Sequence, residues 1–114
     1  EYSTAFYHVM RALGYRTRWV VDWTDHVWVE VDVQGAWMHI DPCEAAFNDK
    51  RMYIGWGKKH TYVVAFSEDG LEDVTAEYAD DMKEVAKRRD LSEPDVEKAL
   101  KEAQEVWATN YSKA

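Results

Sequence analysis

The chain has little of several features that would each point to a class of protein. One cysteine in 114 residues excludes an internal disulfide and a zinc site built from several cysteines, and it fits a reducing compartment. No apolar run approaches the roughly 18 residues of a membrane span, and no signal peptide is visible. Acidic residues outnumber basic ones, 22 to 14, and the net charge of −8 argues against a nucleic acid or an anionic membrane as partner.

What is present fits one globular domain, which we predict to span residues 1–114. Apolar residues make up 46% and charged residues 32% of the chain, the ordinary mixture for a globular protein. Six Trp and seven Tyr are many for this length. Aromatic side chains fill cores, but Trp and Tyr also suit grooves that are half apolar and half wet. We therefore expect some of them to line a groove.

Hydrophobic periodicity predicts an α+β fold, with an N-terminal helix packed on an antiparallel sheet and two helices following it. Gly14 is expected to end the first helix, Gln34-Gly35 to form a tight turn, and Ser92 to cap the last helix. That helix is expected to bury Val96, Leu100, Ala103 and Val106/Trp107. The predicted helices are 2–13, 76–89 and 93 to about 111; the predicted strands are 16–23, 26–33, a strand after the turn, 60–67 and 71–75, with 45–59 irregular.

The predicted hairpin around Gln34-Gly35 brings two polar side chains together. If these two residues form the loop, Val33 faces Ala36 and Trp28 faces Asp41. His26 and Asp41 are then diagonal neighbours on one face of the sheet, roughly 7–8 Å apart at Cα. We expect the opposite, valine-rich face to enter the core and the His26 face to be left for chemistry. A histidine held by a carboxylate is two thirds of a cysteine-hydrolase triad, whose thiolate opens a helix.

Five motifs in order resemble the core of cytoplasmic peptide:N-glycanase, in the transglutaminase-like superfamily, whose triad comes from a helix and two successive strands. They are Arg11-Ala12-Leu13-Gly14-Tyr15, Thr24-Asp25-His26-Val27-Trp28, His39-Ile40-Asp41-Pro42-Cys43-Glu44, Ile54-Gly55-Trp56-Gly57-Lys58-Lys59 and Tyr62-Val63-Val64-Ala65-Phe66. The resemblance covers roughly residues 1–90. It implies an amidase that frees N-linked glycans, with His26 as general base and Asp41 as its orienting acid. It also implies that Glu44, Trp28, Glu30 and Trp56 line the sugar groove, that the ligand is an N-linked glycan or glycopeptide, and that the location is cytoplasmic.

The departures from the family matter as much as the matches. The family has Glu-Trp-Ala-Asn-Cys-Phe where this chain has Glu1-Tyr2-Ser3-Thr4-Ala5-Phe6, so Ala5 stands in the place of the nucleophile. The family's paired Cys-x-x-Cys zinc sites and its N-terminal lobe are not in this sequence. Loss of a triad nucleophile costs on the order of 10⁶ in rate. We therefore expect an inactive, monomeric core without a cofactor, either excised or engineered, and a recombinant origin is one interpretation of it.

The sequence is compatible with other interpretations of several residues. Cys43 is either a small buried filler or, less favoured, a substitute nucleophile. Trp28 and Trp56 fit core packing and ligand stacking equally, whereas Trp19, Trp23 and Trp37 are more typical of sheet packing. His8, His39 and His60 do not have the spacing of metal ligands. Two functions besides the inactive core are compatible with the sequence: a module that binds chitobiose-type glycans without catalysis, and a folding scaffold without a ligand.

Overall fold

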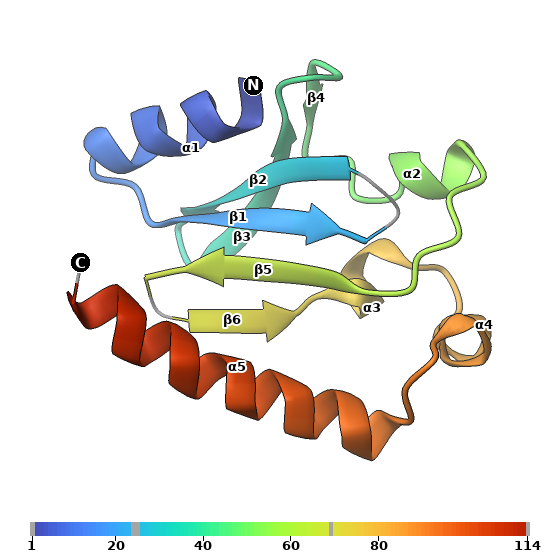
Figure 1. Ribbon diagram of the computed structural model, residues 1–114. Helices are drawn as coiled ribbons and strands as arrows, with labels where there is room; N and C mark the ends of the chain where they lie inside the picture. Colours follow the sequence, from blue (N-terminus) through green and yellow to red (C-terminus); the bar gives the residue numbers. More distant parts are fainter. Residues whose placement is uncertain (1, 24–25, 69, 114) are drawn as a thin grey trace.

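The computed structural model describes residues 2–23, 26–68 and 70–113 and contains one six-stranded sheet (Figure 1). The strand order is β4-β3-β2-β1-β5-β6, and each neighbouring pair is antiparallel. The elements are α1 (Tyr2–Ala12), β1 (Thr17–Asp22), β2 (His26–Val33), β3 (Ala36–Asp41), β4 (Ala46–Phe47), α2 (Met52–Gly55), β5 (Val63–Ser67), β6 (Gly70–Asp73), α3 (Thr75–Tyr78), α4 (Met82–Arg88) and α5 (Glu93–Lys113). Thr24 and Asp25, which open the histidine motif, lie outside the described residues. The predicted α+β class, with a helix before the sheet and helices after it, is confirmed.

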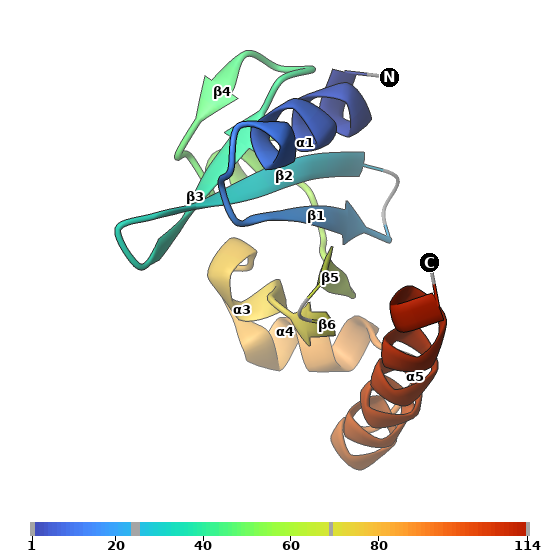
Figure 2. The ribbon, with the colours of Figure 1, turned by 90° about the vertical axis from the view of Figure 1, so that its left-hand side faces the viewer.

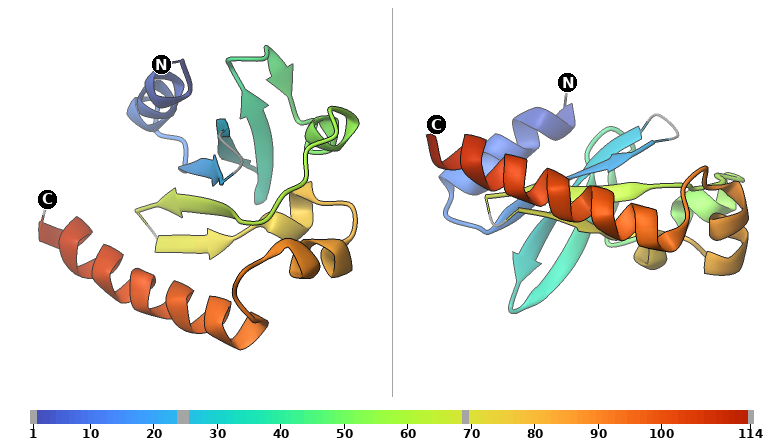
Figure 3. Two further views of the ribbon diagram at one scale, coloured as in Figure 1. Left: turned by 45° about the vertical axis from the view of Figure 1, so that its right-hand side comes forward. Right: turned by 60° about the horizontal axis from the view of Figure 1, so that its bottom comes forward.

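Helices cover both faces of the sheet. α1 packs on β1 and β2, and α5 runs along β6 (Figures 1 and 3). Trp19 of β1, Phe66 of β5 and Trp107 of α5 line one hollow with α1, so α1 and α5 flank the same face. The opposite face carries Trp28, on which Tyr53 of α2 and Tyr78 of α3 pack. β1 and β2 are therefore central strands with protein on both sides.

The β2–β3 hairpin has the predicted register. Gln34 and Gly35 form the turn with φ of +53° and +87°, the left-handed geometry that two-residue hairpin loops require and that glycine adopts without strain. Val33 pairs with Ala36, and the ladder continues to Val29 opposite Ile40. Since side chains alternate along a strand, this register places His26 and Asp41 on one face of the sheet.

The valine face of β2 is buried as expected at Val29 and Val31, but the expectation that the His26 face is left for chemistry is wrong in the middle of the strand. Trp28 and Glu30 are 0% exposed, as is Val29 on the other side. The core cluster contains Trp28 together with Val20, Tyr53, Val63, Ala65, Val74 and Tyr78. Alternating charges in β2 are typical of a solvent-facing strand, but Glu30 is buried here against Tyr78 of α3 and Arg18. The face that carries His26 is thus buried in its middle, and its two ends, His26 and Asp32, reach the surface.

Two segments differ from the prediction after β3. The helix predicted over 76–89 is split into α3 and α4, because Ala79 is extended and Asp81 caps α4 by accepting from the Lys83 backbone N–H. The segment 45–59, predicted to be irregular, contains β4 and the single turn α2. These short elements bring the side chain of Tyr53 under the sheet.

The long helix α5 begins where the sequence predicts, with Ser92 Oγ accepting from the Asp95 backbone N–H at 3.4 Å. Two side chains hold it to the sheet: Trp107 Nε1 donates to the Ser67 carbonyl at 2.8 Å, and Gln104 Oε1 accepts from the Leu71 N–H at 2.7 Å. Ala103 and Val106, predicted to share the buried stripe, are exposed. Within the described ranges, no helix combines the length and the apolar character that crossing a bilayer would need.

Candidate functional site

The site begins with a contact between the first residue of β2 and the last residue of β3. His26 Nε2 lies 2.8 Å from Asp41 Oδ2. The imidazole is 19% exposed, whereas the carboxylate is fully buried. The hairpin register creates this contact, because it sets the two residues diagonally across the strand pair. The structure therefore brings together the histidine and the aspartate that the sequence paired.

The contact fixes which nitrogen of His26 is available for chemistry. An ionised carboxylate only accepts hydrogen bonds, so Nε2 carries the proton and donates it to Asp41. The lone pair of the neutral ring is then on Nδ1. The ring lies near Trp28, Tyr53 and Trp56, with centroid distances of 5.8, 5.6 and 6.1 Å. A histidine held in one tautomer has one nitrogen free to accept a proton.

A second hydrogen bond reaches the same oxygen of Asp41 from below the surface. Tyr53 Oη donates to Asp41 Oδ2 at 2.7 Å, and His39 Nε2 lies 2.6 Å from Tyr53 Oη. The backbone N–H of Asp49 donates to His39 Nδ1 at 3.1 Å. Burial lowers the pKa of His39 from 6.5 to about 4, against the raising effect of Asp41 and Asp49. Burial, followed by the hydrogen bond to Asp41, raises the pKa of Tyr53. Both side chains are therefore neutral at pH 7.

Position 5 lies at the start of α1, which is tied to the same end of the sheet. Ser3 Oγ donates to the Val27 carbonyl at 3.2 Å and lies 3.8 Å from Cys43 Sγ. Figure 2 shows the N-terminal end of α1 and the beginning of β2 on the same side of the molecule. Ala5 follows Ser3 within one helical turn and is exposed. In general, the N-terminus of a helix lowers the pKa of a thiol, and a nearby histidine lowers it further.

The four residues predicted to line the groove divide into two pairs. Trp56 is 51% exposed and lies edge-on to His26, and Glu44 is exposed in the turn after Asp41. Trp28 and Glu30, by contrast, are fully buried. The prediction that these two line a groove is corrected, because a side chain without exposed surface cannot contact a ligand.

Glu30 has partners inside the protein instead. Its Oε1 lies 2.5 Å from Arg18 Nη2, and Tyr78 Oη donates to its other oxygen. Arg18 also reaches Glu72 at 3.2 Å. Burial, followed by the charge of Glu30, raises the pKa of Tyr78. Glu30 is thus part of a buried ion pair below the site.

Cys43 is exposed rather than buried, so its interpretation as a small core filler is corrected. It lies in the turn after Asp41, next to Ser3 at the beginning of α1. Any thiol chemistry at position 5 must therefore be measured against this second thiol. Within residues 2–23, 26–68 and 70–113, no three His, Cys, Asp or Glu side chains gather as metal ligands would.

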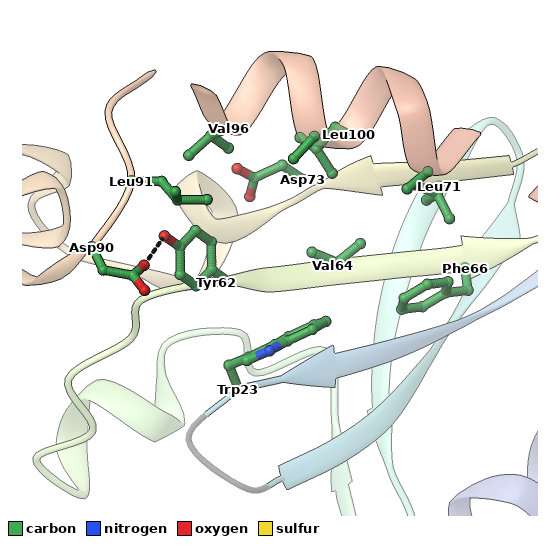
Figure 4. A pocket seen from close by; sticks show the side chains of 12 residues that line it. Trp23, Tyr62, Val64, Phe66, Leu71, Asp73, Asp90, Leu91, Val96 and Leu100 are labelled. Carbon is green, nitrogen blue, oxygen red and sulfur yellow. Dashed lines mark hydrogen bonds between the residues drawn. The ribbon is translucent and has the colours of Figure 1, made fainter. Parts of the chain in front are cut away.

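A large apolar hollow lies elsewhere, between α5 and the sheet (Figure 4). Its volume is about 410 Å³, and Trp23, Val64, Phe66, Leu71 and Leu100 line it. One hydrogen bond joins lining residues at its rim, from Tyr62 Oη to Asp90 at 2.7 Å. The hollow contains neither His26 nor Asp41, so it is separate from the candidate active site.

Most of this chain is similar in sequence to known proteins. Residues 1–42, which hold position 5, His26 and Asp41, match the transglutaminase-like superfamily. A chicken peptide-N(4)-(N-acetyl-beta-glucosaminyl)asparagine amidase is 48% identical over 92 residues, which are 78% of this chain. The chain is a transglutaminase-like core of the peptide:N-glycanase type. Amidases of the same name from rice and Yarrowia lipolytica are 45% and 48% identical over 66% and 68% of the chain.

This peptide:N-glycanase core spans only a small part of those relatives: 14% of the chicken protein, 17% of the rice protein and 23% of the yeast protein. Sequence reasoning alone missed Tyr53 and its role as a partner of Asp41. Tyr53 lies in a segment without periodicity, so no pattern pointed to it. His39 did carry a signal, because strand alternation puts it on the same face as Asp41.

Proposed function

We propose that this chain is a peptide:N-glycanase-type core that keeps the base and the orienting acid of a thiol amidase but lacks the nucleophile. Ala5 has a methyl group where the related enzymes, by the resemblance of the first helix, have a sulfur. His26 would take the proton of that thiol through Nδ1, and Asp41 would hold the ring and stabilise its protonated form. With no attacking atom at position 5, the chain does not hydrolyse the glycan–asparagine amide.

The observation that carries this proposal is the 2.8 Å contact between His26 and a fully buried Asp41, at the end of the sheet where α1 begins. The names of the relatives describe an amidase acting on N-acetylglucosaminyl-asparagine, so the proposed substrate class of an active form is an N-linked glycopeptide. We further propose that residues 1–114 form a single monomeric domain and that the location is cytoplasmic.

The test restores the sulfur. Ala5→Cys is made in a Cys43→Ser background, so that one thiol is present, and its alkylation by iodoacetamide is followed from pH 5.5 to 9. The matched control is Ala12→Cys in the same background, an exposed alanine at the other end of α1. His26 and the helix N-terminus should lower the pKa of the thiol at position 5 by about two. The larger thiolate fraction, partly offset by weaker intrinsic nucleophilicity, predicts alkylation about five-fold faster than the control at pH 6.5.

Adding His26→Ala to Ala5→Cys should remove most of that advantage, because the thiolate then loses its partner. Equal alkylation rates for the position 5 and position 12 thiols across the pH range would overturn the proposal. Release of glycan from a glycopeptide by Ala5→Cys would go further, since it would show the whole amidase reaction in this core.

A second candidate function is glycan binding without catalysis, favoured by the exposed ring of Trp56 beside His26 and by the exposed Glu44 nearby. Di-N-acetylchitobiose should then shift NMR signals of Trp56 and of His26 beside it, and Trp56→Ala should abolish the His26 shift. Trp23→Ala is the matched control, because Trp23 is similarly exposed at 58% but lies at the hollow below α5. An unchanged spectrum up to millimolar sugar would favour a folding scaffold without a ligand.

A further inference from the structure

We propose that Tyr53 and His39 are positioning residues, which hold the Asp41 carboxylate through a one-way chain of hydrogen bonds and so fix the tautomer of His26. The inference rests on the proposed function, because the His26 tautomer matters for chemistry only if this ring is the base. It goes beyond that function, because neither residue belongs to the triad.

The direction of the chain follows from its far end. The Asp49 backbone N–H can only donate, so His39 Nδ1 accepts and carries no proton. A neutral His39 must then carry its proton on Nε2 and donate to Tyr53 Oη at 2.6 Å. The tyrosine hydroxyl, with its lone pair engaged, donates its own proton to Asp41 Oδ2 at 2.7 Å. Each step leaves one arrangement of protons, and the last donor points at the carboxylate.

Packing holds the residues of this hydrogen-bond chain in place. Tyr53 is 0% exposed, and its ring stacks on Trp28 with a centroid distance of 4.3 Å and an interplanar angle of 18°. His39 is also fully buried and lies edge-on to Tyr53. Rings locked in this way cannot follow Asp41 if the carboxylate rotates. The chain therefore acts as a fixed reference for the orientation of Asp41.

The Asp41 carboxylate needs a group that fixes its orientation. Both His26 and Tyr53 bind Oδ2, and Asp41 Oδ1 has no hydrogen-bond partner among the described residues. A buried carboxylate with one unsatisfied oxygen gains by rotating toward any other donor. Tyr53 opposes that rotation and keeps Oδ2 aimed at His26 Nε2, which leaves Nδ1 as the basic nitrogen.

The experiment reads histidine tautomers by ¹⁵N NMR at pH 7, in the unmutated chain and in two variants. Unmutated His39 and His26 should both have the proton on Nε2. Tyr53→Phe should lower the Nε2–H to Nδ1–H ratio of His26 about five-fold, the equivalent of one neutral hydrogen bond. Tyr78→Phe is the matched control, since it removes the hydrogen bond of an equally buried tyrosine to another carboxylate, Glu30. It should leave both histidines unchanged.

A proton on Nδ1 of His39 in the unmutated protein would reverse the direction of the hydrogen bonds and overturn the proposal. This measurement requires no variant. An unchanged His26 ratio in Tyr53→Phe, or an equal change in Tyr78→Phe, would also overturn it. Should Tyr53→Phe fail to fold, His39→Gln keeps a donor to Tyr53 and should preserve the ratio, while His39→Leu should lower it. These tautomers are independent of thiol reactivity, so a failure of Ala5→Cys to react faster would reject the proposed function alone.

Discussion

Acidification should destabilise this protein through His39, and the structure gives the sign. Burial lowers the pKa of folded His39 from 6.5 to about 4, whereas the unfolded chain keeps the ordinary value. Between these two pH values the unfolded state binds more protons than the folded state. The stabilisation is therefore complete above about pH 6.5 and is lost as the pH falls toward 4.

The magnitude follows from the difference between the two pKa values. Each pH unit over which only the unfolded state is protonated costs 1.36 kcal/mol, so His39 accounts for at most about 3 kcal/mol between pH 7 and pH 4. That is a large part of the stability of a small domain, roughly 5–15 kcal/mol. Urea unfolding at pH 7, 6, 5 and 4, followed by tryptophan fluorescence, measures this change in the free energy of unfolding.

His39→Gln provides the comparison, because the amide keeps a donor toward Tyr53 Oη and does not titrate. The carboxylates of both proteins respond to acid alike, so the difference between their stability–pH curves isolates His39. The wild-type curve should fall more steeply between pH 6.5 and 4, by about 1 kcal/mol per pH unit. Parallel curves would refute the reasoning, since they would mean that His39 titrates normally in the fold.

Two further predictions concern the sheet. Glu30→Ala should lower the free energy of unfolding in urea by about 3–5 kcal/mol, because it leaves the buried guanidinium of Arg18 without its main partner. Glu72→Ala removes an exposed partner of the same arginine and should lower it by about 1 kcal/mol or less. Similar losses in the two variants would contradict the burial of the Arg18–Glu30 pair. Gln34→Asn should raise the midpoint temperature of thermal unfolding, since asparagine tolerates the φ of +53° at this turn position better than glutamine does. A lower midpoint would contradict the left-handed geometry of this turn.

The hairpin that builds the site was predictable because its information is local. Gln34-Gly35 fixes the loop at two residues, and the alternation of side chains along β2 and β3 then puts His26 and Asp41 on one face, so their pairing follows from strand geometry. The first helix and the capped last helix were predictable for the same reason: their signals lie within one or two turns of the chain.

What the sequence could not reveal depends on segments that are distant along the chain. Glu30 lies in a strand whose alternation is typical of an exposed face, and only the covering helix α3 and the counter-charge of Arg18 make its burial possible. Tyr53 lies in a single helical turn without a period of its own. Its contact with Asp41 is set by how the segment after β4 folds back under the sheet.

The bond between Gln104 and the Leu71 N–H bears on how this protein behaves at high concentration. The outer strand of a sheet presents free amide groups on which another chain can add a strand, the first step toward aggregation. Here a helix side chain occupies one of those groups on β6, and the opposite outer strand, β4, is only two residues long. The sheet thus ends on both sides in a form that offers a poor template for fibril growth.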